Sequence, residues 1–283
     1  MKSLPRAWEL FCQSFIVLSE EEGILIFPVL SAISAILLGA TFFVPLFAVG
    51  TFQALAHHRA TWMDYVPLFS WYLANTFVVV FFNSAMVACT NIRLSGGKPT
   101  VSDGLRIAAG CIHRIAAWAL LSATVGILLR IVEEQSQRWG RILASFLGIG
   151  WTMLTYLIVP VIVLEDRSVT DSVSRSAQLF RKTWGEQMAG GFGFGLLNML
   201  LILPGVGLAL LMVKLSLPLA VIMGVVYMLM LAAVTSAVRQ IFTVALYRYA
   251  TSGEAPFGFT ADSLGGAAAK SRNAPGEWQA GKW

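Results

Sequence analysis

The chain has 283 residues, of which 57% are hydrophobic and only 12% are charged, and its formal net charge is +5. Soluble domains carry roughly 25% charged residues, and a single hydrophobic core stops growing near 250–300 residues, so these values exclude an ordinary water-soluble globular protein. The positive charge is not gathered into a basic cluster with interleaved aromatic residues, which argues against nucleic-acid binding and favours basic membrane-protein loops.

Long uncharged runs predict membrane-spanning helices. Crossing the hydrocarbon core takes about 20 apolar residues in a helix, and only helices or closed barrels satisfy every backbone hydrogen bond there. The runs are continuous and too long for the alternating strands of a barrel, which predicts an all-α polytopic bundle within residues 1–250. We expect six spans, near residues 24–49, 66–90, 115–132, 142–164, 188–213 and 217–238.

The C-terminal tail has a different composition. Residues 251–283 are rich in glycine, alanine and serine and contain few bulky apolar side chains. Such a segment cannot bury enough apolar surface to offset the entropy of ordering, so we expect a disordered tail, at least beyond Gly265.

Lysine and arginine are distributed unequally between the two sides of the predicted spans. Fourteen lie in the N-terminal segment, the second-to-third and fourth-to-fifth connections and the tail, whereas five lie in the other connections. Cytoplasmic loops carry the excess of basic residues, which predicts that both termini face the cytoplasm of a cell membrane.

Two loop segments share a helix-capping pattern. Thr100-Val101-Ser102-Asp103 precedes the third predicted span, and Ser168-Val169-Thr170-Asp171 precedes the fifth. In each, the first hydroxyl can accept from early backbone N–H groups, and the aspartate is favourable in the positively polarised first turn. Each segment is therefore predicted to begin a helix.

An amphipathic helix is predicted before each pair of spans. Residues 6–15 match residues 175–184, with apolar positions at helical spacing at Trp8, Phe11 or Cys12, and Phe15 in the first segment. Together with the capping segments, this predicts three repeats of one amphipathic helix followed by two spans. Such helices lie in the membrane interface with their aromatic residues toward lipid, although they could also serve only as connectors resting on the bundle.

Several segments resemble a known family. They are Ala123-Thr124-Val125-Gly126, the run from Pro160 to Glu165, the run from Arg175 to Glu186 and Leu246-Tyr247-Arg248-Tyr249-Ala250. Over roughly residues 6–259 the chain resembles an uncharacterised prokaryotic membrane family, domain-of-unknown-function family 6159. The resemblance implies a six-span fold and a bacterial or archaeal source, and it implies no activity, ligand or catalytic residue.

No motif predicts a catalytic, cofactor-binding or metal site. The three cysteines, Cys12, Cys89 and Cys111, lack metal-ligand or redox spacing, and we interpret them as small buried hydrophobic residues. His57 and His58 are adjacent and so point in different directions on a helix, with no third ligand at a characteristic spacing.

Polar and small residues within the spans are the candidate functional positions. The candidates for the bundle interior are Asn75, Asn83, Asn198 and Arg239. They could be interhelical hydrogen-bonding residues or could line a polar path. Gly191 and Gly195 form a pair that would let another helix approach closely, and Pro204-Gly205 is expected to interrupt the fifth span.

These patterns predict a non-enzymatic integral membrane protein. It would contact membrane lipids or other membrane proteins through its cytoplasmic interfacial helices, and it would not bind nucleic acid. The alternative is a transporter or channel for a small solute, which would use the interior asparagines and a helix broken at Pro204-Gly205.

Overall fold

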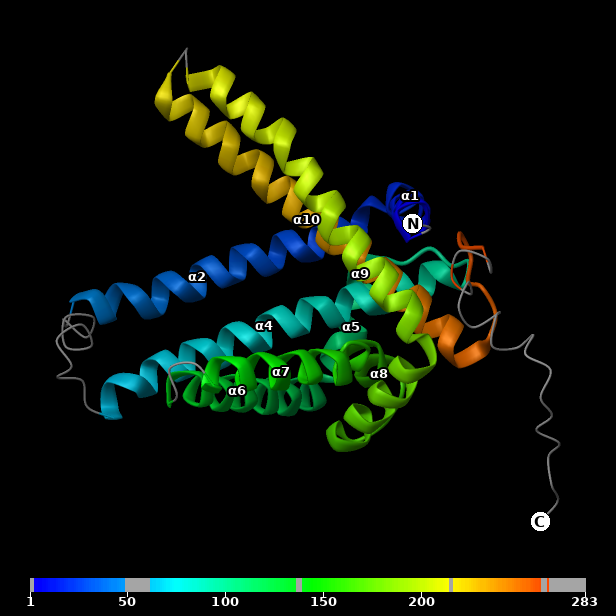
Figure 1. Cartoon of the computed structure of the whole chain (residues 1–283), viewed down its shortest axis with the longest axis horizontal. Coiled ribbons are helices and arrows are strands. Elements are labelled where there is room, and N and C mark those ends of the chain that lie inside the picture. Colours follow the sequence, from blue (N-terminus) through cyan, green and yellow to red (C-terminus); the bar gives the residue numbers. More distant parts are fainter. Residues whose placement is uncertain (1–2, 49–61, 136–138, 214–215, 261–263, 265–283) are drawn as a thin grey trace. The chain divides into compact units, whose positions relative to one another are not determined.

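The computed structural model describes residues 3–48, 62–135, 139–213, 216–260 and 264, and in this part of the chain it is all-α, as predicted (Figure 1). The elements are α1 Ser3–Glu20, the 3-10 turn η1 Glu22–Leu25, α2 Ile26–Ala48, α4 Trp62–Leu94, α5 Val101–Gly110, α6 Ile112–Gln135, α7 Trp139–Leu154, α8 Ile158–Leu164, α9 Val169–Val213 and α10 Leu217–Ser252.

Within the residues that the structure describes, five stretches are long and apolar enough to cross a membrane. They are Glu22–Phe47, Val66–Leu94, Ile112–Arg130, Ile142–Leu164 and Leu217–Ser252. The predicted span near residues 188–213 lies within α9, which contributes the shorter apolar stretch Asn198–Val213. By length and composition, the chain is therefore a polytopic helical membrane protein.

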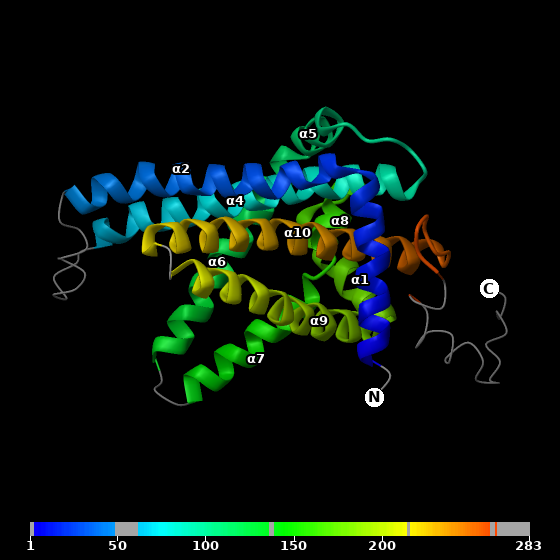
Figure 2. The same cartoon turned by 90° about the horizontal axis from the view of Figure 1, so that it is seen from above.

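The chain forms two compact units, whose boundaries fall within α1 and α9. Unit 2 is Leu18–Ala177, and unit 1 combines Met1–Val17 with Gln178–Trp283. In unit 2, α2, α5, α6 and α8 all pack against α4, and α7 packs against α6. Figures 1 and 2 both show α2 beside α4. The α4 run from Ala85 to Cys89 is buried on every side, because its small side chains let neighbouring helices approach closely.

The predicted helix starts at Thr100 and Ser168 are confirmed. The Thr100 hydroxyl accepts from the Asp103 backbone N–H at 3.2 Å, and the Asp103 carboxylate accepts from the Thr100 N–H at 3.0 Å, forming a capping box for α5. At α9, the Ser168 hydroxyl accepts from the Asp171 N–H, also at 3.2 Å, and donates to the Asp171 carboxylate.

Removing the α5 cap tests its contribution to stability. Thr100→Ala is expected to lower the free energy of unfolding by about 1 kcal/mol, because the Asp103 N–H loses its acceptor. Hydrogen bonds from Thr100 also hold the pKa of Asp103 below its usual value. A lowered carboxyl pKa stabilises the fold above the pKa of the unfolded chain, and this stability is lost as the pH falls through the folded pKa.

The difference in the free energy of unfolding between wild type and Thr100→Ala should therefore become smaller at acidic pH. Detergent-induced unfolding measures this difference. Ser102→Ala provides the control, because Ser102 is an exposed α5 residue outside the capping box. Equal destabilisation by the two substitutions would contradict this role for the cap.

The expected interruption at Pro204-Gly205 was wrong, whereas the predicted span 142–164 matches the apolar stretch Ile142–Leu164. The predicted span 142–164 is divided into α7 and α8 at residues 155–157, close to Pro160, whose ring cannot donate a helical hydrogen bond. The Leu157 N–H at this break donates instead to the Ser176 hydroxyl at 3.1 Å. In contrast, α9 remains helical through Pro204, where the Tyr227 hydroxyl donates to the Leu201 carbonyl of the preceding turn at 2.6 Å.

Unit 1 contains an antiparallel hairpin of α9 and α10. Gly205 lies against the Tyr227 ring, and Gly224 lies opposite Ala209, so these small residues let the two helices approach closely. Helix α10 ends at Ser252, beyond the predicted span end at 238, and Gly253 follows with the left-handed φ of 77° that favours glycine.

The chain after α10 packs against α1 within unit 1. Gln13 donates to the Thr260 hydroxyl at 3.4 Å, and Gly258 lies close to Val17. Phe259 is buried. Residues up to 260 of the predicted tail therefore hold defined contacts, and the remainder of the predicted tail, apart from residue 264, lies outside the described residues.

Candidate functional site

Three short helical segments each lead into a long apolar helix through a local break in backbone geometry. Glu21, with φ −139° and ψ 71°, separates α1 from η1 and α2. Cys111, with φ −102°, separates α5 from α6, and Thr183, with φ −118°, marks a kink within α9. These breaks lie where the predicted amphipathic helices join the predicted spans. The equivalence of the three segments as sequence repeats stays a prediction.

Helix α1 carries a row of three aromatic side chains, of which the outer two are exposed and Phe11 is half-buried. The Trp8 and Phe11 rings lie 6.1 Å apart, and the Phe11 and Phe15 rings lie 6.3 Å apart, each pair stacked. Trp8 is 55% exposed and Phe15 is 46% exposed, whereas Leu10 and Ser14 are buried. Helix α1 therefore presents an aromatic face of the kind found at membrane–water interfaces.

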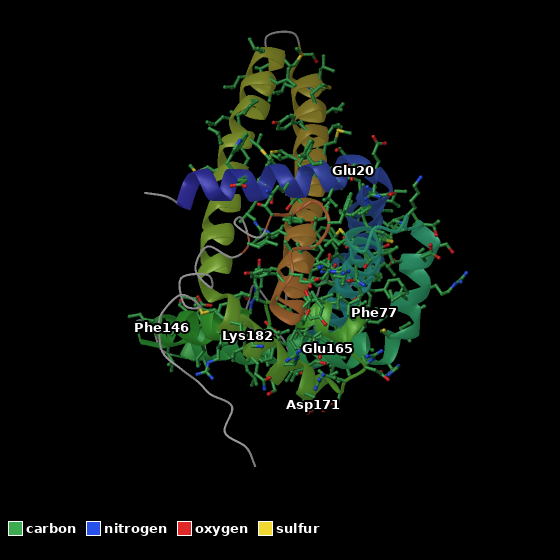
Figure 3. All side chains as sticks on the ribbon, turned by 90° about the vertical axis from the view of Figure 1, so that its right-hand side faces the viewer. Glu20, Phe77, Phe146, Glu165, Asp171 and Lys182 are labelled. Carbon is green, nitrogen blue, oxygen red and sulfur yellow. The ribbon has the colours of Figure 1, made fainter. Side chains whose placement is uncertain are left out.

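An ion-pair cluster joins the end of α1 to the end of α4 within unit 2. The Arg93 guanidinium contacts the carboxylates of Glu20 and Glu21, the second at 3.5 Å. The Arg93 and Glu21 side chains are 14% and 19% exposed, so water screens this pair less than a surface pair. The cluster links the residues that precede α2 to the last turn of α4 (Figure 3 labels Glu20).

A second cluster is centred on Glu165, the residue that follows α8. Its carboxylate accepts from Arg175 Nε at 3.1 Å and from Arg167 Nε, while its backbone carbonyl accepts from Arg114 at 2.9 Å (Glu165 is labelled in Figure 3). The Glu165 side chain is 15% exposed. Two arginines thus offset the cost of burying this carboxylate.

Arg114 extends this cluster to the joint between α5 and α6. Its guanidinium lies 3.2 Å from the Asp166 carboxylate and 3.1 Å from the Cys111 sulfur. One side chain therefore connects the α5–α6 joint to the end of α8. The chemical effect of both clusters is to hold the short helices against the ends of the long ones.

A small cavity lies between η1, α4 and the start of α5. It has a volume of about 210 Å³, and Glu21, Cys89 and Thr100 are among its lining residues. The Cys89 thiol donates to the Thr100 carbonyl at 3.3 Å. Within the described ranges, no group of three or more histidine, cysteine, aspartate or glutamate side chains could hold a metal ion.

The predicted interior polar residues fall in both units. Asn75 and Asn83 are half-buried on α4 in unit 2, Asn198 is half-buried on α9 in unit 1, and Arg239 is exposed on α10 in unit 1. The cavity at Thr100 is lined by none of the four. That they line one polar path stays a prediction.

The predicted packing role of the Gly191 and Gly195 pair stays a prediction, because the structure describes the surroundings of Gly195 alone. A Cβ atom at Gly195 would meet no neighbouring atom within 4 Å, and the side-chain surroundings of Gly191 lie outside the described residues. A close contact between α9 and α10 occurs at Gly205, where a Cβ atom would lie 2.2 Å from the Tyr227 ring.

The sequence interpretation missed Glu165 as a structural centre. A signal was present, because this carboxylate directly follows an apolar run and is flanked by Arg167 and Arg175. A carboxylate at the end of a span, with arginines in the following helix, is a pattern that predicts a partly buried ion pair.

The comparisons with known proteins identify a family without a known activity. A family model described as a family of unknown function, DUF6159, matches residues 62–257, which is more than half of the chain. No curated protein and no solved structure matches the chain. The matched region runs from α4 through α10 and includes Arg114, Glu165 and Arg175. The chain therefore belongs to the family of unknown function DUF6159.

Proposed function

We propose that this is a non-enzymatic, multi-pass protein of the cell membrane whose short amphipathic helices contact lipid at the cytoplasmic surface. The observation that carries the proposal is the aromatic row of α1, in which Trp8 and Phe15 are exposed and the half-buried Phe11 ring stacks between them. Aromatic rings are favourable at the level of the lipid headgroups, where one part of the ring meets hydrocarbon and another meets water.

The placement of α1 supports this role. Helix α1 leads through Glu21 and η1 directly into the apolar stretch Glu22–Phe47, so it lies at the end of a span. Lys98, just before α5, and Arg106, on α5, are exposed. Basic side chains in such positions can attract anionic lipid headgroups. Both termini would then be cytoplasmic, in agreement with the excess of basic residues in the connections on that side.

Transport of a small solute is the alternative, and one observation favours it. The break between α7 and α8 is of a kind that transporters use to expose backbone groups to a substrate. However, the Leu157 N–H at this break is occupied by Ser176, which gives the break a structural explanation. We therefore favour the lipid-contact function.

Site-directed spin labelling of the full chain in lipid bilayers tests the proposal. Labels at Trp8 and Phe15, introduced after replacing Cys12, Cys89 and Cys111 with alanine, should collide more with membrane-soluble oxygen than with a water-soluble nickel chelate. A label at Glu9, the exposed neighbour of Trp8, is the matched control and should show the opposite preference. If the nickel chelate reaches all three labels equally, α1 does not contact lipid.

A further inference from the structure

The cavity between η1, α4 and the start of α5 contains a carboxylate that the protein itself satisfies only in part. Glu21 lines this cavity, and its side chain is 19% exposed. The Arg93 guanidinium lies 3.5 Å from the Glu21 carboxylate, which is longer than the roughly 2.7–2.9 Å of a charge-assisted hydrogen bond. Arg93 donates a hydrogen bond to Glu20 instead, and among the described residues no group donates one to the Glu21 carboxylate.

Partial burial makes this unused acceptor unfavourable. A carboxylate removed from water costs free energy unless hydrogen-bond donors replace the water. The Glu165 side chain, which is similarly buried at 15% exposure, accepts from the Nε atoms of Arg175 and Arg167. Glu21 has no such donors, so a donor that occupied the cavity would supply what the protein does not.

The other walls of the cavity offer no second free polar partner. The Thr100 hydroxyl exchanges hydrogen bonds with Asp103, and the Cys89 thiol donates to the Thr100 carbonyl. The remaining lining residues are small or apolar, namely Gly23, Ile24, Pro99 and Val101. A hard metal ion would need several oxygen ligands, and an anion would be repelled by the carboxylate, so neither fits this lining.

Ordered water alone would also fill the cavity poorly. Its volume of about 210 Å³ is far above the roughly 10–15 Å³ that one buried water needs. A buried water typically makes about three hydrogen bonds, whereas this lining has a single free acceptor group. The cavity therefore suits a larger group that combines one cationic donor with an apolar part.

The position of the cavity fits a lipid headgroup. The apolar stretch Glu22–Phe47 begins beside it, and the stretch Val66–Leu94 ends shortly beyond Cys89. The ends of membrane spans lie at the level of the headgroups. Ile24 is 1% exposed whereas Thr100 is exposed, so the cavity reaches from the surface to the buried joint between η1 and α4.

We propose that this cavity binds a protonated primary amine on a short aliphatic stem. The ammonium group would donate to the Glu21 carboxylate, and the methylene groups would contact Ile24 and Val101. Phosphatidylethanolamine presents this group at the membrane surface, and free ethanolamine presents the same chemistry in solution. The site lies in η1, α4 and α5 and does not involve the aromatic row of α1, so either proposal can fail without the other.

Native mass spectrometry of the full chain released from detergent micelles tests the site. Phosphatidylethanolamine is compared with phosphatidylcholine of identical acyl chains, because the quaternary ammonium of choline has no N–H to donate. We expect phosphatidylethanolamine to bind about tenfold more tightly, which corresponds to roughly 1.4 kcal/mol.

Free ethanolamine is the second arm of this experiment. Tighter binding of the phospholipid than of ethanolamine identifies the lipid as the source of the amine, whereas tighter binding of ethanolamine identifies a soluble amine. Failure of both arms, with no preference for phosphatidylethanolamine over phosphatidylcholine and no binding of ethanolamine, would overturn the proposal.

Glu21→Gln should weaken amine binding about tenfold, because the side chain loses its charge and keeps its shape. Glu22→Gln is the matched control. Glu22 is the next residue in the chain, it is exposed and it does not line the cavity, so this variant should bind as wild type does.

Gly23→Leu provides a second variant in case Glu21→Gln, which also alters the Arg93 contact, fails to fold. A Cβ atom at Gly23 would lie 3.8 Å from the Val101 side chain, which is ordinary contact, so the leucine side chain can occupy the cavity while Glu21 is retained. Circular dichroism first establishes that each variant is folded. Folded variants that keep wild-type amine binding would contradict the proposal, whereas weaker binding in both, with Glu22→Gln unchanged, would support it.

Discussion

Replacing Gly104 with alanine is expected to lower the free energy of unfolding by about 2 kcal/mol. A Cβ atom there would lie 2.6 Å from the Cys89 sulfur, 2.7 Å from the Ala85 carbonyl oxygen and 2.9 Å from the Phe27 ring. The Ala85 carbonyl belongs to the backbone of α4 and cannot rotate away. Helix α5 must therefore move off α4, which weakens the packing of three elements at once.

Unfolding of the purified protein in mixed detergent micelles, followed by circular dichroism, measures this effect. Gly110→Ala is the matched control, because it lies at the end of the same helix and its Cβ atom would meet nothing within 4 Å. We expect it to be neutral or stabilising, since alanine has the higher helix propensity. A Gly104→Ala protein as stable as wild type would show that α5 does not pack this closely on α4.

The second large effect is expected from Glu165→Ala. This substitution leaves the Arg175 and Arg167 guanidinium groups without their carboxylate partner, and the Glu165 side chain is only 15% exposed. Removing one member of a buried ion pair costs 3–5 kcal/mol, and because Arg175 is 28% exposed we expect a smaller loss of about 2 kcal/mol. The same detergent unfolding experiment measures it.

Asp166 supplies the control for Glu165. It is the next residue in the chain and also pairs with an arginine, Arg114, but its side chain is 99% exposed. Because solvent-exposed ion pairs contribute little, Asp166→Ala should change the stability by less than about 0.5 kcal/mol. If Glu165→Ala and Asp166→Ala both cause only a small loss of stability, the Glu165 cluster does not hold α8 and α9 together.

The difference between these neighbouring acids could not be predicted from the sequence. Both follow the same apolar run and both lie near arginines along the chain. Which carboxylate becomes buried depends on where the start of α9 packs, since Arg175 is ten residues from Glu165 and reaches it only through the fold. The nearby arginines can indicate an ion pair in this region, but they do not indicate which of the two carboxylates becomes buried.

The effects of Pro160 and Pro204 on their helices also could not be predicted from the sequence. Pro160 lies beside a broken helix and Pro204 lies within a continuous one, although both occur in apolar runs. Around Pro204, the Tyr227 hydroxyl from α10 satisfies a carbonyl of the preceding turn. Near Pro160, the Ser176 hydroxyl satisfies an N–H at the break. The presence of a proline in an apolar run therefore did not by itself predict whether the helix is broken.

The amino-acid sequence by itself determined that this chain is helical, where its long apolar helices lie and how α5 and α9 begin at Thr100 and Ser168. Hydrocarbon leaves the backbone of such apolar runs no other hydrogen-bonding partner, and a helix cap joins residues only three apart, so both signals are local. Only the tertiary structure decided the break before α8, the contact at Gly104 and the pairing of Glu165, because each requires segments distant in sequence to meet.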